Sequence, residues 1–254
     1  MEEKIVKMII ILLSKFLYFF GKIFGKNMSL PGKLALKMDS LILKKIKLPG
    51  NIIMVTGSNG KTSTTEMISK ILISAGFSVC CNFDSNNQIE ENITTILKNT
   101  TINGTLKKDV LLIQCDESSV SQIIKNIKPK YLVITNIYRQ KLRKNGHPEL
   151  VYDHLNKVLT QDIHLILNTD DPLSSLYGYK RENVTYFGVN KNSLSNINNI
   201  SRYDDTKYCP NCKSAMQYKY YHFNHIGCYQ CEKCGHSRKE PNYEVTNYKK
   251  SIDN

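Results

Sequence analysis

Residues 52–63 read Ile-Ile-Met-Val-Thr-Gly-Ser-Asn-Gly-Lys-Thr-Ser, an apolar run that ends in a glycine-bracketed turn followed by Lys-Thr. The apolar run predicts a buried strand, and residues 64–74 after the turn predict a helix. Glycines let successive backbone N–H groups curl inward, and the N-terminus of the following helix adds the positive end of its dipole. This order of strand, glycine turn and helix is typical of a phosphate-binding loop, so we expect the chain to bind a nucleotide.

Each side chain of the turn has an expected role. Lys61 can reach the terminal phosphates, and the hydroxyl of Thr62 can ligate Mg²⁺. Val55 stands where the longer phosphate loop has a further glycine, so this is the shorter form Gly-x-x-Gly-Lys-Thr. The alternative is a plain strand–turn–helix with a surface lysine. The predicted nucleotide contacts in the loop are Gly57, Ser58, Asn59, Gly60, Lys61, Thr62 and Ser63.

Composition limits the possibilities only broadly. The chain has 254 residues, which suits one α/β domain with an insertion or two small domains. Its net charge of +13 suits an anionic partner, whether a nucleotide, a nucleic acid, a phospholipid surface or a phosphorylated substrate. Charge alone does not choose among these partners.

Strands and helices alternate along the chain after the phosphate loop. Short apolar runs predict further strands at 77–82, 109–115, 131–135, 163–168, 184–189 and 243–248. Helical patterns lie between them at 87–98, 118–127 and 149–159. The alternation predicts βαβ units, and hence an α/β fold with a mainly parallel sheet and helices on both faces.

The N-terminal region carries one strongly apolar segment, residues 8–20, within a predicted helix at 1–25. The segment has only about 13 residues, whereas a membrane-spanning helix needs about 20. We therefore expect a helix packed on the domain; the alternative is peripheral membrane contact by a helix in the membrane interface. The lysines that flank the segment in that alternative are Lys4, Lys7, Lys22 and Lys26. A turn at 29–32 and a second helix at 33–47 follow.

Polar residues follow two of the predicted strands. Asn136 comes after the strand at 131–135, and Asn168, Asp170 and Asp171 come at the end of the strand at 163–168. Ligands of parallel sheets bind beyond the carboxyl ends of the strands. An asparagine amide can pair with the edge of adenine, and the aspartates could hold ribose hydroxyls or position Mg²⁺ through water. The alternative is that Asn-x-Asp-Asp-Pro is simply a good turn sequence.

Five of the eight cysteines lie between residues 209 and 234. Two Cys-x-x-Cys pairs, separated by residues 213–230, fit a closed, structural Cys₄ zinc site. The predicted ligands are Cys209, Cys212, Cys231 and Cys234. The alternatives are Cys228 as a ligand, substitution by His222, His225 or His236, or thiols without metal. Tyrosines between the pairs are expected to pack the two arms of the ribbon, and Cys80, Cys81 and Cys115 to be small buried hydrophobes.

Together these segments resemble the central ATP-binding domain of the Mur ligase family. The resemblance is carried by Thr56–Thr62, Thr135–Ile137 and Asn168–Pro172, and the Cys₄ ribbon with Ser29–Lys37 points to the MurT branch. It implies a helical segment at 1–50, an ATP-binding domain at 51–207 and an inserted zinc ribbon at 208–236. Residues 237–254 would then return to the ATP-binding domain or form a truncated end, without the family's C-terminal domain.

The resemblance also implies an activity. MurT-type chains are the synthetase subunits of lipid II isoglutaminyl synthases, so the chain is expected to be an ATP-dependent carbon–nitrogen ligase of peptidoglycan biosynthesis. It would use ATP, Mg²⁺ and a structural Zn²⁺, with Lys61 as the catalytic residue. The partner would be a GatD-like glutaminase in a heterodimer, and the substrate lipid II. The expected location is the cytoplasm, at the inner face of the membrane.

Some residues depart from the family pattern. Gln114 stands where the family has a Mg²⁺-binding glutamate, so Asp116 or Glu117 is expected to take over the metal with Thr62. The alternative is a weakened metal site. Gln140 and Arg143 stand where carboxylates are expected. The departures support an alternative, a truncated or degenerate ATP-binding paralogue with a regulatory or scaffold role. A basic zinc ribbon that binds nucleic acid is a more distant alternative. It does not need the 135–137 and 168–172 segments, so no nucleic-acid partner is expected.

Overall fold

The computed structural model describes six stretches of the chain: 2–23, 29–82, 88–138, 147–199, 206–222 and 226–246. Gln140, Arg143, His225 and Lys26 lie outside the described residues. The chain divides into two compact units. The first comprises Met1–Val133 with Lys157–Ile163, and the second comprises Ile134–Asn156 with His164–Asn254. This division runs inside the predicted ATP-binding domain, and the predicted domain boundaries stay a prediction.

The main sheet has seven strands in the order β2-β3-β1-β4-β5-β6-β9. Their bounds are β1 Asn51–Thr56, β2 Val79–Cys81, β3 Val110–Gln114, β4 Tyr131–Ile134, β5 His164–Asn168, β6 Val184–Val189 and β9 Tyr243–Val245. β3 pairs in parallel with β1 and β2, and β6 pairs in parallel with β5 and β9. The predicted α/β fold with a mainly parallel sheet is confirmed.

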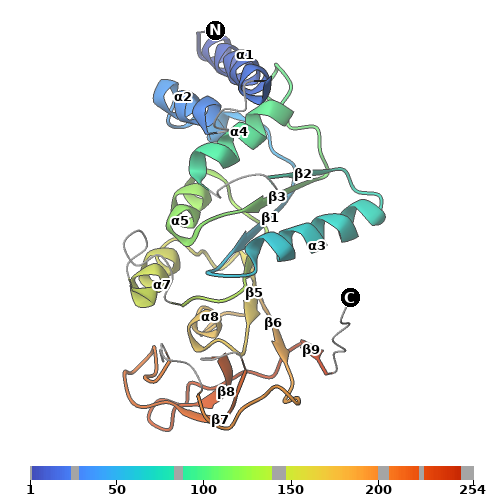
Figure 1. Cartoon of the computed structure of the whole chain (residues 1–254). Coiled ribbons are helices and arrows are strands. Elements are labelled where there is room, and N and C mark those ends of the chain that lie inside the picture. The colour runs from blue at the N-terminus through green and yellow to red at the C-terminus, as the bar shows by residue number, and fades with distance from the viewer. Residues whose placement is uncertain are drawn as a thin grey trace. The chain divides into compact units, whose positions relative to one another are not determined.

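Within the first unit, helices cover β1, β2 and β3 (Figure 1). These helices are α3 Lys61–Ser74, α4 Ile89–Asn99 and α5 Glu117–Asn126. Helix α3 connects β1 to β2, and α4 then connects β2 to β3, which lies between β1 and β2 in the sheet. The two connections run in opposite directions across the sheet, so right-handed crossovers place α3 and α4 on opposite faces of the sheet. Every residue of β3 is buried, as a parallel strand covered on both faces requires. Its neighbours in the core include Met54, Ile93, Ile96 and Leu97.

The segment before β1 differs from its prediction. The expected turn at 29–32 lies mostly in helix α2, Leu30–Met38, because Pro31 in the first turn of a helix favours its start. The expected single helix over 33–47 is also wrong. Asp39 ends α2, and its side chain accepts a hydrogen bond from the backbone N–H of Leu41. A 3-10 turn at Ile42–Lys45 follows.

Helix α1, Glu2–Ile23, contains the apolar N-terminal segment and packs against α2 and α4 (Figure 1). Among the described residues, no helix combines the length and the apolar content needed to cross a membrane.

Cys80 and Cys115 are buried as expected, whereas Cys81 is half-buried. Burial raises the pKa of Cys80 to about 11, so this thiol stays protonated and inert at neutral pH.

The second unit contains β5, β6 and β9, helices α7 Pro148–Asn156 and α8 Pro172–Leu176, and a separate hairpin. The hairpin pairs β7, Gln217–His222, with β8, Ile226–Gln230, in antiparallel fashion. Its strands were not predicted, although the tyrosines do pack there, since the rings of Tyr218 and Tyr221 are stacked. The short helix α8 was missed, because its first residues read as a turn.

We predict that Gly32→Ala destabilises the first unit. An added Cβ at Gly32 would lie 1.8 Å from the backbone oxygen of Glu90 in α4, so the two helices would have to separate. Overpacking of this kind lowers the free energy of unfolding by about 1–3 kcal/mol. Urea denaturation measures it. Gly50→Ala is the matched control, because nothing lies within 4 Å of its added Cβ. Equal stability of the two variants would contradict the close packing of α2 on α4.

Candidate functional site

The predicted phosphate-binding loop joins β1 to α3. Gly57 and Gly60 have positive φ angles of 133° and 79°, and α3 begins at Lys61. Gly60 occupies the N-cap position in a left-handed conformation that other residues rarely adopt. No side chain caps this helix. The N–H groups of the first helical turn are therefore left for another acceptor, which is what an anion-binding loop requires.

The side chain of Lys61 folds back over the loop. Its Nζ donates hydrogen bonds to the backbone oxygens of Gly57 and Ser58, the latter at 3.3 Å, and lies 3.9 Å from Oδ1 of Asp116. The lysine side chain is only 10% exposed. These neighbours are carbonyls and one carboxylate, which phosphate oxygens can replace as partners of the ammonium group.

The other loop residues differ in exposure. Asn59, Thr62 and Ser63 are exposed, so their side chains are open to a ligand, whereas Ser58 is buried. Thr62 and Ser63 lie in the first turn of α3. The hydroxyl predicted to ligate Mg²⁺ is therefore accessible from solvent.

Gln114, at the end of β3, is fully buried and part of an amide network. Its Nε2 donates to the backbone oxygen of Asn82 at 3.2 Å, and its backbone N–H donates to Oδ1 of the same asparagine at 2.9 Å. Its Oε1 is buried and has no hydrogen-bond partner. Asp116 and Glu117 follow at the start of α5 and are 2% and 7% exposed. An unpartnered amide oxygen beside buried carboxylates is a set of hard oxygen donors that suits Mg²⁺.

In the second unit, Asn168 and Asp171 join the two predicted strand-end segments. Asn168 Nδ2 donates to the backbone oxygen of Thr135 at 2.9 Å, and its Oδ1 accepts from the N–H of Asp170 at 3.0 Å. Asp171 Oδ2 accepts from the N–H of Ile137 at 2.7 Å. Its Oδ1 accepts from Leu173 at 3.1 Å and caps α8. The structure thus brings Asn136 and the 168–171 segment together.

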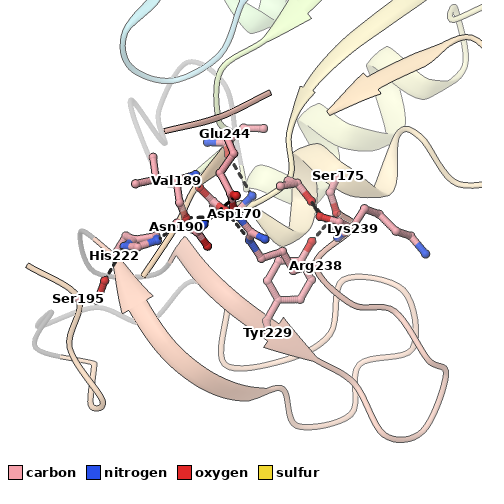
Figure 2. Close-up of polar contacts among 12 residues, drawn as sticks. Asp170, Ser175, Val189, Asn190, Ser195, His222, Tyr229, Arg238, Lys239 and Glu244 are labelled. Atoms are coloured by element: carbon pink, nitrogen blue, oxygen red, sulfur yellow. Dashed lines mark hydrogen bonds and ion pairs between the residues drawn. The ribbon is translucent and has the colours of Figure 1, made fainter. Parts of the chain in front are cut away.

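Asp170 is almost fully buried and makes an ion pair (Figure 2). Its Oδ1 accepts from Nε of Arg238 at 2.7 Å, and its Oδ2 accepts from the backbone N–H of Val189 at 2.7 Å. Burial raises the pKa of Asp170, and Arg238 opposes that effect. Both carboxylate oxygens therefore have protein partners, and a ribose would have to share or displace them.

Arg238 was not identified from the sequence. Besides Asp170, its guanidinium contacts the backbone oxygen of Val189 at 3.3 Å and Oε1 of Glu244 in β9 at 3.4 Å (Figure 2). It therefore connects the ends of β5, β6 and β9. No local pattern marks the residue, because its partners lie as far as 68 positions away along the chain.

The four predicted zinc ligands form one cluster. The Sγ atoms of Cys209 and Cys234 are 3.6 Å apart, those of Cys212 and Cys231 are 3.5 Å apart, and all four lie within 4.8 Å of one another. A tetrahedral ion with Zn–S bonds of about 2.3 Å would place sulfurs about 3.8 Å apart. The donor set and its spacing therefore fit Zn²⁺. The pKa of Cys212 is lowered to about 6, chiefly by the backbone N–H of Ser214.

The two cysteine turns have the same backbone form. Each places the residue after its second cysteine at positive φ, with 62° at Lys213 and 74° at Gly235. The N–H of each of these residues donates to the backbone oxygen of the first cysteine of its turn, at 2.9 Å. The glycine was recognisable in the sequence, but the equivalent role of Lys213 was not.

The alternative ligands lie outside this cluster among the described residues. Cys228 is not part of it. His222 Nε2 contacts the backbone oxygen of Val189 at 2.9 Å, and His236 Nε2 contacts that of Pro172 at 2.9 Å. Tyr229 of β8 is hydrogen-bonded to Ser175 of α8 (Figure 2). The hairpin is thus fastened to the segment that follows β5.

The predicted site residues divide between the two units. The phosphate loop, Asp116 and Glu117 belong to the first unit. Asn136, Asn168, the two aspartates and the four cysteines belong to the second. Their roles in binding stay predictions.

Comparison with known proteins places this arrangement in a family. The family model of the Mur ligase middle domain matches residues 55–231. The lipid II isoglutaminyl synthase (glutamine-hydrolyzing) subunit MurT of Staphylococcus aureus strain COL is 29% identical over 225 residues, covering 88% of this chain and 50% of the relative. Its counterpart in Streptococcus pneumoniae strain ATCC BAA-255 / R6 is 32% identical over 231 residues, covering 87% and 49%. The chain spans about half the length of these curated relatives.

A solved structure shows the same fold. The pseudomurein peptide ligase type C from Methanothermus fervidus superposes with a TM-score of 0.62 at 27% identity, covering 82% of this chain and 40% of the ligase. The matched family model extends from the end of β1 to residue 231, just after β8, and so includes candidate site residues of both units. The chain therefore belongs to the Mur ligase family, of which it contains the middle domain.

Proposed function

We propose that this chain is the ATP-binding part of an amide ligase of the MurT type, which amidates the D-glutamate α-carboxylate of lipid II. The observation that carries the proposal is the phosphate loop, where an uncapped helix N-terminus and Lys61 converge on one concave turn. The similarity to MurT chains, which are named as subunits of glutamine-hydrolysing lipid II isoglutaminyl synthases, supports the choice of substrate.

The proposed chemistry has two steps. A carboxylate oxygen of the substrate attacks the γ-phosphorus of ATP, and the bond from that phosphorus to the bridging β-phosphate oxygen breaks. The products are an acyl phosphate and ADP, which departs as the leaving group. Ammonia then attacks the acyl carbon, inorganic phosphate leaves, and the nitrogen gives up a proton as the amide forms. Phosphorylation is needed because a carboxylate oxygen is a poor leaving group. Lys61 and the N–H groups of the loop stabilise the charge on the transferring phosphoryl group.

Mg²⁺ would be held by the Thr62 hydroxyl and by oxygen atoms of Asp116, Glu117 and Gln114. Bound there, it would neutralise charge on the β- and γ-phosphates. The buried, unpartnered Oε1 of Gln114 supports this assignment, because an amide oxygen is a hard ligand although it carries no charge.

In the second unit, we propose that the segments 135–137 and 168–171 contact the nucleoside. Asn168 and Asp171 connect the two segments by hydrogen bonds, so we assign them to positioning. Asn136 is the residue proposed to meet the adenine edge. The zinc ion, held by Cys209, Cys212, Cys231 and Cys234, would be structural, because four thiolates leave it no open position.

Ammonia would come from a glutaminase partner, as the names of the MurT relatives indicate. The substrate is attached to lipid, so the reaction would take place at the inner face of the membrane. A second candidate function is ATP binding without transfer, in a regulatory or scaffold role. The uncharged Gln114 in place of a family carboxylate favours it, because an amide holds Mg²⁺ less strongly.

We predict that Lys61→Met weakens ATP binding roughly ten- to hundredfold, because it removes charge-assisted hydrogen bonds worth about 1.5–3 kcal/mol. Titration calorimetry with Mg-ATP measures the dissociation constant. Lys70→Met is the matched control, since its side chain lies on the same helix and is 73% exposed. If both variants bind as the unmodified chain does, Lys61 does not contact the nucleotide.

The zinc content of cysteine variants shows which second Cys-x-x-Cys pair binds the metal, Cys231 with Cys234 or Cys228 with Cys231. The purified chain should carry about one zinc ion, and Cys231→Ser should lose it because a four-thiolate site does not survive with three. Cys228→Ser should keep the metal, since this thiol lies outside the cluster. Elemental analysis by mass spectrometry gives the ratio of zinc to protein. Cys234→Ser should lose zinc as well, because Cys234 belongs to the cluster. Loss of zinc in the Cys228→Ser variant with retention in the Cys234→Ser variant would instead identify Cys228 and Cys231 as the second pair of ligands.

The ligase proposal is tested with the complete gene product, lipid II, ATP and Mg²⁺. Ammonium chloride serves as one nitrogen source, and glutamine with a glutaminase serves as the other, so a missing partner is not mistaken for a missing activity. We expect release of phosphate that depends on lipid II, and amidated product in the mass spectrum. Lipid II that is already amidated and the Lys61→Met variant should release none. ATP binding without phosphate release from either nitrogen source would favour the non-catalytic role.

A further inference from the structure

Helix α1 has two apolar faces, and only one of them is buried. Ile10, Ile11 and Ser14 are buried on the side that packs against α2 and α4. Polar contacts fasten the same side, because Lys7 Nζ donates to the backbone oxygen of Lys45 at 3.4 Å and Lys98 Nζ donates to the hydroxyl of Tyr18 at 3.1 Å. The orientation of α1 on its unit is therefore defined.

The opposite side of α1 is an exposed apolar stripe. Six large side chains recur at alternating steps of four and three residues, so they form one line along the helix. They are Ile5, Ile9, Leu12, Phe16, Phe19 and Ile23, and they are 46%, 46%, 45%, 58%, 61% and 59% exposed. A continuous apolar stripe of this kind, unlike scattered apolar residues, marks an interaction surface.

A line of lysines borders this stripe. Lys4, Lys15 and Lys22 are spaced by 11 and 7 residues, about three and two helical turns, so they share one side of α1. After Glu3 the helix contains no acidic residue. An apolar protein surface would not need a row of positive charges along the contact, whereas an anionic lipid surface attracts each of them.

We propose that the exposed stripe of α1 lies in the interface of an anionic phospholipid membrane, with Lys4, Lys15 and Lys22 at the level of the lipid phosphates. The apolar residues enter the boundary between headgroups and acyl chains, and α1 lies parallel to the surface. The opposite face stays packed on α2 and α4, so the whole unit is held at the membrane. The proposal rests on α1 alone and is independent of ligase activity.

The chain contains no tryptophan, so one introduced tryptophan reports its own surroundings. Phe16→Trp places the probe in the stripe, and Ile71→Trp places it on α3 at a residue that is 68% exposed. Vesicles of phosphatidylcholine mixed with phosphatidylglycerol should shift the Phe16→Trp emission to the blue, and brominated acyl chains should quench it. The Ile71→Trp emission should change in neither respect. Identical behaviour of the two probes would overturn the proposal.

Cosedimentation with the same vesicles separates the apolar from the electrostatic contribution. The stripe variant is Phe16→Ser with Phe19→Ser and Ile23→Ser. Its control removes equally exposed apolar side chains of α3: Met67→Ser, Ile71→Ser and Ile73→Ser. The lysine variant is Lys4→Gln with Lys15→Gln and Lys22→Gln. Its control removes three positive charges from exposed lysines outside α1: Lys125→Gln, Lys128→Gln and Lys157→Gln.

The stripe variant should lose vesicle binding, while its control keeps it. The lysine variant should partition about a hundredfold more weakly, because each lysine near an anionic surface contributes about a fivefold gain. Binding of the unmodified chain and of the two control variants should fall when phosphatidylcholine is used alone, because the surface then carries no net negative charge. Circular dichroism melts confirm that each variant is folded.

Two further results would also overturn the proposal. One is vesicle binding that the stripe variant retains in full. The other is a dimer in sedimentation velocity that the stripe variant dissolves, without any binding of vesicles by the unmodified chain, because the occupant would then be a second copy. The Lys61→Met variant should bind vesicles normally, so a failure of the ligase proposal and a failure of this one are distinguishable.

Discussion

The ion pair between Asp170 and Arg238 is the interaction on which the second unit depends. It is buried, and it lies where the end of β5, the end of β6 and the strand β9 converge. Removing one partner of a buried pair leaves an uncompensated charge and costs about 3–5 kcal/mol, more than the exposed ion pairs of this chain can contribute. The β7–β8 hairpin and the segment after it are attached to α8, through Tyr229 to Ser175 and through His236 to the backbone oxygen of Pro172. The four-cysteine cluster and this edge of the sheet therefore belong to the same compact unit.

The candidate site residues of the two units are prepared for a ligand in different ways. In the first unit, polar groups are left available: the uncapped N–H groups of α3, the exposed hydroxyls and the amide oxygen of Gln114. In the second unit, the polar side chains are already satisfied by backbone groups: Asn168 donates to the backbone oxygen of Thr135, and Asp171 accepts from the backbone N–H of Leu173. The first arrangement supplies binding energy directly. The second fixes the shape of a surface, which reduces the entropy lost on binding.

Sequence reasoning predicted the glycine turn after β1, the buried strand β3 and a group of four cysteines, because each of these signals is local. It leaves the binding roles of these residues as predictions. It failed where a distant contact decides the local structure. The segment predicted as a turn lies in α2, where Gly32 packs closely on the backbone of Glu90, and α8 is capped by Asp171 while Ser175 is hydrogen-bonded to Tyr229. The importance of Arg238 appears only when residues 170 and 238 are seen together.

The separation of Asp170 from Arg238 has a consequence for biosynthesis. Asp170 is synthesised 68 residues before Arg238. At about 5–20 residues per second, the carboxylate therefore exists for roughly 3–14 s before the arginine is synthesised. During that interval β5 and α8 lack the hairpin that later covers them, and the edge of β6 has no neighbour in β9. The second unit therefore cannot complete its core while the chain is emerging. It closes in a late step, once the cysteines and Arg238 are available together.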